Sequence, residues 1–93
     1  MDDATAYYQE FKAKLTDSQP WPGTYLYKFI VKQQSNHLSV IKALFTDQST
    51  EITERKSSKG SYRSLSILAN NQTPDKVVEI YKQVKQLKGV IIL

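Results

Sequence analysis

The sequence contains no cysteine and a single histidine, His37. Without cysteine, a protein has no disulfide framework, no thiolate zinc site, no iron–sulfur cluster and no cysteine nucleophile. One histidine supplies neither a two-histidine metal site nor a histidine–cysteine dyad. We therefore expect no metal site, no cofactor and no catalytic residues, and we expect that the protein is not an enzyme.

Long apolar runs are also missing. The longest are residues 29–31 and 90–93, far short of the roughly 20 residues that a membrane-spanning helix needs. The sequence opens Met1-Asp2-Asp3 with no apolar block behind it, which is not how an intact secretory signal peptide begins. We therefore expect a cytoplasmic location and no membrane partner.

Charge is unevenly distributed around a net value of +4. Acidic side chains outnumber basic ones up to residue 23, and basic ones outnumber acidic ones from residue 24 onward. A mild positive field attracts nucleic acids, acidic surfaces or small anions. It also keeps a small protein soluble, so the charge alone assigns no partner.

The first segment predicts a helix in front of the main domain. An aspartate, Asp2 or Asp3, is positioned to cap it, and residues 19–23 end it because Pro20 and Pro22 cannot continue a helix. The apolar residues that recur at helical spacing are Ala4, Tyr8, Phe11 and Leu15. We therefore expect an accessory helix within residues 1–18 and a single domain over residues 19–93.

The main domain predicts four strands and two helices. Apolar and polar residues alternate most clearly in residues 24–32 and 61–69, as in strands buried on one side. Residues 49–56 and 90–93 are weaker strands. The first helix begins after Asn36, which is a capping residue. The second begins at Thr73-Pro74 and ends at Gly89, a left-handed C-cap. The order β-α-β-β-α-β predicts an α+β, ferredoxin-like fold: a four-stranded antiparallel sheet with both helices on one face.

This arrangement leaves one face of the sheet without helices. The apolar residues that alternation places there are Leu26, Ile30, Tyr62 and Leu68. Leaving so many apolar side chains in water would be unusual for a monomeric protein. Either the N-terminal helix covers them with Tyr8, Phe11 and Leu15, or another chain does.

Two stretches carry a resemblance to a known family. One is Trp21-Pro22 followed by Tyr25-Leu26-Tyr27-Lys28-Phe29, and the other is the run Ser57-Ser58-Lys59-Gly60-Ser61-Tyr62-Arg63-Ser64-Leu65-Ser66-Ile67. From about residue 20 to the end, the chain resembles the YbeD-like family of small bacterial proteins, a domain-of-unknown-function family. The resemblance implies a ferredoxin-like fold similar to ACT-type regulatory domains, and it implies no activity.

The turn at residues 57–60 is the predicted functional site. Parallel first and second strands place this turn at the same end of the sheet as the loop of residues 33–36 and the start of the helix that follows, where an anion is favoured. The candidate anion- or partner-binding residues are Ser57, Ser58, Lys59, Gly60, Tyr62 and Arg63. The alternative is a hairpin made basic for solubility, with Gly60 needed only for the turn.

Three binding functions remain open. RNA-binding sheets alternate aromatic residues after a Lys-Gly pair, but Ser61 and Arg63 stand where those aromatic residues belong. ACT-type ligand sensors usually carry a glycine after the first strand, and residues 33–36 have none. We therefore favour a regulatory or protein-interaction module that binds another protein, or a second copy of itself, through the open sheet face. A small-ligand sensor and a weak nucleic-acid- or anion-binding domain are the alternatives.

Overall fold

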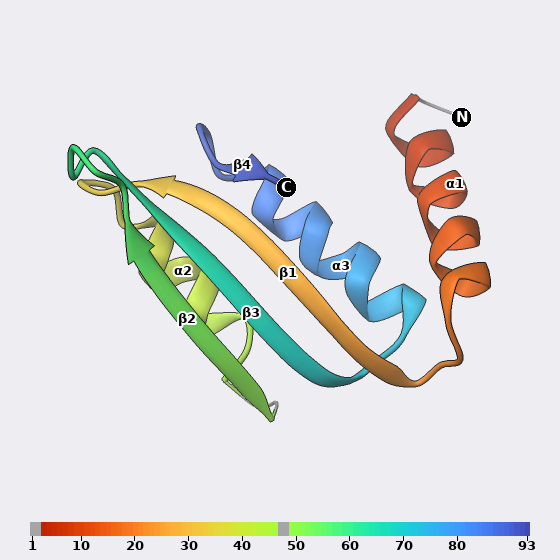
Figure 1. Ribbon diagram of the computed structural model, residues 1–93. Helices are drawn as coiled ribbons and strands as arrows, with labels where there is room; N and C mark the ends of the chain where they lie inside the picture. The colour runs from red at the N-terminus through yellow and green to blue at the C-terminus, as the bar shows by residue number, and fades with distance from the viewer. Residues whose placement is uncertain (1–2, 47–48) are drawn as a thin grey trace.

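The computed structural model describes residues 3–46 and 49–93. Its elements follow the predicted order, β-α-β-β-α-β behind an N-terminal helix, so the α+β prediction is confirmed (Figure 1). The elements are α1 (Asp3–Ser18), β1 (Gly23–Lys32), α2 (His37–Ala43), β2 (Thr50–Lys56), β3 (Tyr62–Gln72), α3 (Pro74–Lys85) and β4 (Ile91–Ile92). Asp2 and the side chains of Asp3 and Ala4, named above for the start of the first helix, lie outside the described part.

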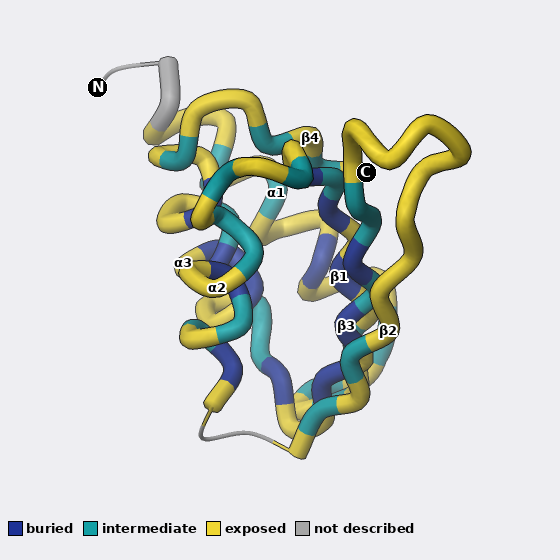
Figure 2. Tube along the Cα trace, turned by 90° about the vertical axis from the view of Figure 1, so that its left-hand side faces the viewer, coloured by how far each residue is buried: buried dark blue, intermediate teal, exposed yellow. Residues whose placement is uncertain are grey.

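The sheet has four strands in the order β2-β3-β1-β4, with neighbouring strands antiparallel. This is the strand order of a ferredoxin-like fold, with the polar strand β2 at an edge. Charged side chains on an exposed edge discourage pairing with other molecules. Figure 2 shows the helices on the left of the sheet, so its right-hand face is left without a helix.

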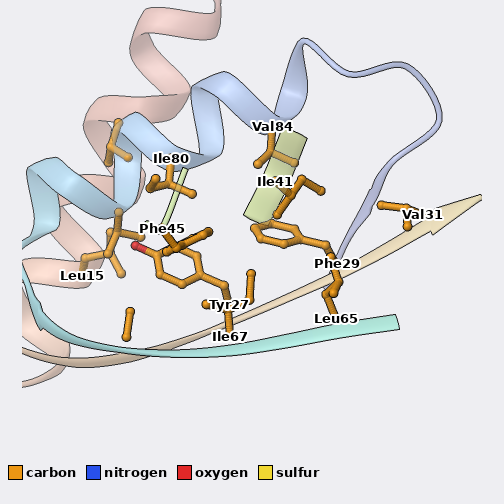
Figure 3. Close-up of a cluster of buried hydrophobic side chains, with 13 residues drawn as sticks. Leu15, Tyr27, Phe29, Val31, Ile41, Phe45, Leu65, Ile67, Ile80 and Val84 are labelled. Carbon is orange, nitrogen blue, oxygen red and sulfur yellow. The ribbon is translucent and has the colours of Figure 1, made fainter. Parts of the chain in front are cut away.

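Alternation along the two central strands builds the core. Tyr27 and Phe29 point from β1 toward the helices, where they meet side chains of α2 and α3 (Figure 3). The fully buried residues around them are Val31, Ile41, Leu65, Ile67, Ala69, Val77 and Val84. Burying one such aliphatic or aromatic side chain contributes about 1.5–3 kcal/mol. The core therefore lies between this face of the sheet and the helices.

Helix α1 packs on α3, on the same side of the sheet as α2. The ring centroids of Phe11 and Tyr81 are 4.9 Å apart and the rings are stacked. Leu15 is only 5% exposed, and its carbonyl accepts a 2.7 Å hydrogen bond from the indole nitrogen of Trp21. The alternative that this helix covers the open sheet face is wrong. The helix packs instead on the apolar surface of α3, which lies on the other side of the sheet. The division into an accessory helix, residues 1–18, and a domain, residues 19–93, stays a prediction.

Strand β3 extends three residues beyond its predicted end at Ala69. The Asn70-Asn71 pair reads as a turn in sequence, and Asn71 does have a positive φ of 56°. Pairing with β1 nevertheless continues to Gln72, whose partner is Gly23. Gln72 is fully buried and accepts a 2.7 Å hydrogen bond from the hydroxyl of Tyr27. Tertiary contacts thus override the local turn preference.

The helix ends differ from prediction at two positions. Asn36 precedes α2 as expected, but its side chain makes no capping hydrogen bond; the backbone amide of His37 donates instead to the Ser35 hydroxyl, 3.4 Å away. Gly89 has the predicted positive φ, 83°, but the C-cap of α3 is Gln86. Gly89 therefore turns the chain within the connection to β4 and does not close the helix.

The last strand is shorter and less buried than its four consecutive apolar residues suggest. It pairs with β1 through Ile92 opposite Phe29 and Ile91 opposite Ile30. Ile91 is 48% exposed and Leu93 is 67% exposed, since alternation sends every second side chain to the face without helices. Two of the four apolar side chains therefore add to the open surface.

Candidate functional site

The candidate site is the sheet face that carries no helix, which we call the open face. The strand register fixes its members, because residues paired across neighbouring strands project on the same side. They are Glu51, Thr53 and Arg55 of β2, Tyr62, Ser64, Ser66 and Leu68 of β3, Leu26, Lys28, Ile30 and Lys32 of β1, and Ile91 and Leu93 at the chain end.

The open face carries most of the exposed apolar surface. Leu26 and Leu68 face each other across β1 and β3 and are 47% and 39% exposed. Tyr62, at the hairpin end, is 40% exposed. Within residues 3–46 and 49–93, the large exposed apolar side chains that lie elsewhere are Tyr7 and Val40. Apolar groups thus concentrate on one surface, which is typical of a contact site.

A groove runs across this face above two small residues, Ser64 and Ser66. It consists of two hollows that share Arg55 and Ser64 as lining residues. The hollow nearer the hairpin, about 390 Å³, is lined by Ile30, Arg55, Lys56, Ser57, Tyr62, Ser64 and Ile91. The other, about 320 Å³, is lined by Lys28, Phe29, Thr53, Arg55, Ser64, Leu65, Ser66 and Leu93. The groove therefore has a hydroxyl-bearing floor, and its walls combine apolar side chains with basic ones.

Three cations line the groove: Lys56 in the hollow nearer the hairpin, Lys28 in the other hollow and Arg55 in both. Lys28 lies on β1 opposite Ser66, and Arg55 lies on β2 opposite Ser64. The ion pairs among the described residues are Lys12–Asp75, Lys42–Glu54 and Arg63–Glu54, so none of the three groove cations is in an ion pair. Glu51 is the one acidic residue that the described strands place on the open face. The groove is consequently positive.

The predicted hairpin turn forms as expected. The Gly60 amide donates to the Ser57 carbonyl over 3.0 Å, and Gly60 has a φ of 71°. The Ser57 hydroxyl accepts from the Tyr62 amide at 3.1 Å, so this serine is engaged in the turn itself. The Gln33 amide donates to the Ser61 carbonyl at 2.9 Å, which confirms that the hairpin and the loop after β1 lie at the same end.

Beside the turn is a third hollow of about 480 Å³, and it brings together only part of the predicted site. Its lining residues are Lys32, Gln33, Gln34, Lys59, Gly60, Ser61 and Tyr62. The helix that was expected to attract an anion here, α2, has only seven residues, so its dipole adds little. Ser58 is exposed in the turn.

Arg63 lies on the helix-covered side, away from Tyr62. Its Nε donates to the Gln33 amide oxygen and its terminal nitrogen to a Glu54 carboxylate oxygen, both at 3.1 Å. Lys42 approaches the other Glu54 oxygen at 2.7 Å. Hydrogen bonds from Lys42 and Arg63 hold the pKa of the Glu54 carboxyl below its ordinary value. The structure thus separates Tyr62 and Arg63, as strict alternation along β3 already implied.

Sequence reasoning missed the groove and the role of Arg55. The signal was present: serine at 64 and 66 places two small side chains between larger neighbours on one face. Among the residues described, no cluster of histidine, cysteine or carboxylate side chains has the composition of a metal site. The described helices include none that is long and apolar enough to cross a membrane.

Comparison with known proteins places this fold in a family. No curated protein matches the chain. A solved structure, the ACT domain from GTP pyrophosphokinase of Chlorobium tepidum, is similar with a TM-score of 0.50 and 14% identity, covering 75% of this chain and 99% of that one. At that identity the likeness shows the fold alone. Residues 17–93 match the family model described as "Protein of unknown function (DUF493)", so α1 lies almost wholly outside the match. The predicted YbeD-like resemblance is confirmed, and the protein belongs to the DUF493 (YbeD) family.

Proposed function

We propose that this protein is a non-enzymatic interaction module that binds another protein through its open face. The supporting observation is the uncovered apolar surface around the groove. Helix α1 is an additional helix that could have covered this face, but it packs on α3 and leaves Leu26 and Leu68 exposed. A surface of this kind is stabilised by contact with a partner.

The positions of the perturbed ionisable groups support binding over catalysis. Burial raises the pKa of Tyr27 and of Tyr81, and a hydrogen bond with Tyr25 adds to the rise at Tyr81. Tyr27 is fully buried in the core, and Tyr81 of α3 is partly buried against it, so both lie on the helix-covered side of the sheet, opposite the groove. Catalytic acids and bases are usually perturbed groups inside a cleft. Here the two tyrosines contribute to packing and the third perturbed group, Glu54, is held by Lys42 and Arg63, so none of the perturbed groups lies in the groove.

Co-purification from the native cell tests this proposal. The open-face variant is Leu26→Ser/Leu68→Ser, in which serine matches residues already present on this face. The matched control is Tyr7→Ser/Val40→Ser, which removes two exposed apolar side chains elsewhere. We expect wild type and control to retain a protein partner that the open-face variant loses, with or without nuclease. Equal recovery by all three proteins would remove the support for the open face.

A second candidate function is suggested by the hollow beside the hairpin. Lys32 and Lys59 line it together with the backbone at Gly60, so a small anionic ligand is the chemistry it suits. A ligand that binds only the folded protein raises its melting temperature. We expect phosphate-bearing metabolites to stabilise wild type but not Lys32→Ala/Lys59→Ala. Stabilisation that survives in this variant would place the anion elsewhere, and binding that weakens steeply with salt and needs nucleic acid would favour a nucleic-acid partner.

A further inference from the structure

The shape of the open face suits a helix. Its apolar side chains form two clusters at different points along β1. Leu26 lies beside Leu68 in one cluster, and Ile30 lies beside Ile91 in the other. These clusters are four residues apart, or about 13 Å at the rise of a strand. A helix rises 5.4 Å per turn, so two to three turns with an apolar stripe span that distance. The opposite face of the same sheet is already covered by helices, and a helix on this face would complete a three-layer arrangement.

The charges of the groove decide what such a helix must carry. Lys28 and Arg55 lie on the two sides of the serine floor, and neither has an acidic partner among residues 3–46 and 49–93. A helix laid in the groove removes both from water, and a desolvated charge without a counter-charge is strongly destabilising. The occupant must therefore bring carboxylates to the two borders of the groove.

A second copy of this chain does not meet that requirement. Two open faces in contact would bring a second Lys28 and a second Arg55 into the interface, and each copy offers Glu51 as its acidic residue on this face. Cations would outnumber anions between two chains that each carry a net charge of +4. Like charges brought together at an interface disfavour association.

We propose that the occupant of the groove is an acidic amphipathic helix of a partner protein. Its apolar stripe contacts Leu26, Leu68 and Ile30, and its carboxylates pair with Lys28 and Arg55. This inference rests on the proposed function and adds the partner's chemistry to it.

Two synthetic helical peptides with the same leucine stripe test the inference on the full-length chain. One carries glutamate at its polar positions and the other carries lysine. Amide chemical-shift mapping by NMR locates the contact, and a titration at low and at high salt gives the affinity. We expect the glutamate peptide to shift the amides of Lys28, Ser64 and Ser66, to weaken at high salt, and to bind at least tenfold more tightly than the lysine peptide.

Paired variants isolate the charge contribution. Lys28→Gln/Arg55→Gln should weaken the glutamate peptide by at least threefold. The matched control is Lys14→Gln/Lys76→Gln, which removes the same charge from exposed residues of α1 and α3 and should leave the affinity unchanged. Equal weakening by both variants would mean that only the net charge matters, and would overturn the inference.

Failure of this inference is distinguishable from failure of the proposed function. Equal binding of both peptides, binding of neither, or shifts confined to α1 and α3 overturns the acidic helix. A dimer in solution that Leu26→Ser/Leu68→Ser dissociates also overturns it, because the occupant is then a second copy. In each case the proposed open-face function still depends on the co-purification experiment, in which the same variant is compared with Tyr7→Ser/Val40→Ser.

Discussion

The two faces of the sheet are made by the same strands and differ in almost every other respect. On β3, Leu65 is 1% exposed beneath the helices, and Leu68 is 39% exposed on the open face. On β1, Tyr27 is fully buried, while Lys28 beside it borders the groove. The comparison shows what alternation does along these strands: one residue in two is buried in the core, and the next lies on the exposed open face.

The largest expected contrast comes from one substitution made on both faces of β3. Leu65→Ala should lower the free energy of unfolding by about 2–5 kcal/mol, since it opens a cavity in the core. Leu68→Ala removes the same atoms from an exposed site, and its effect should be within about 0.5 kcal/mol of zero. Urea denaturation of the two variants measures both values. Similar losses in the two would mean that the open face also carries folding stability.

A second contrast appears at alkaline pH. Burial raises the pKa of Tyr27 and Tyr81 above the ordinary tyrosine value of 10.0. Folding therefore favours the neutral hydroxyls, and this stability is fully present below about pH 10 and is lost as the pH rises beyond it. Melting temperatures followed from neutral pH upward should fall above pH 10. The fall should be smaller in Tyr27→Phe/Tyr81→Phe and unchanged in Tyr7→Phe/Tyr62→Phe; the same fall in both pairs would contradict the assignment.

Removing one tyrosine hydroxyl from each face should give a smaller difference in the free energy of unfolding. Tyr27→Phe loses the buried hydrogen bond to Gln72 and should cost about 1 kcal/mol in the free energy of unfolding. Tyr62→Phe changes an exposed ring on the open face and should be close to neutral. Chemical denaturation at neutral pH compares them. A neutral Tyr27→Phe would show that the buried hydrogen bond adds nothing net.

The smallest expected effect concerns the two ion pairs of Glu54 at the margin of the covered face. Glu54→Gln removes the carboxylate that joins Lys42 and Arg63 and should cost less than about 1 kcal/mol, because these ion pairs are near the surface. The pKa of Glu54 is lowered in the folded protein, so its contribution is present above the ordinary pKa and is lost as the pH falls through the folded value. The difference between Glu54→Gln and wild type should therefore disappear in acid and shrink in high salt; a difference that persists in acid would need another cause.

Features set by local residue order were predictable. Alternation placed Tyr27 and Phe29 on the covered face. The Thr73-Pro74 pair predicted the start of α3, where the Thr73 hydroxyl accepts from the Lys76 amide at 3.2 Å. Gly60 supplied the positive φ of the hairpin. In each case a few neighbouring residues carry the whole signal, and no distant part of the chain is needed.

Features set by distant contacts were not predictable. The site of α1 depends on which apolar surface is nearest, and the Phe11–Tyr81 stacking shows that α3 provides it. The end of β3 depends on Gln72 meeting Tyr27, 45 positions away in the sequence. The candidate site falls between these cases. The open-face residues followed from alternation, but the groove required the register of β2, which brings Arg55 opposite Ser64.

The bond between Tyr27 and Gln72 also bears on how the strands choose their alignment. A slip of β3 by one residue would send Leu65 and Ile67 into water, so burial forbids it. A slip by two residues keeps every side chain on its own face, so the alternation of apolar and polar residues does not exclude it. Such a slip would carry the Gln72 amide two positions along β1, away from the Tyr27 hydroxyl, and would separate the Thr24 hydroxyl from its 2.9 Å contact with Asn70. The buried hydrogen bond between Tyr27 and Gln72 thus selects one strand register, where the apolar residues alone would allow two.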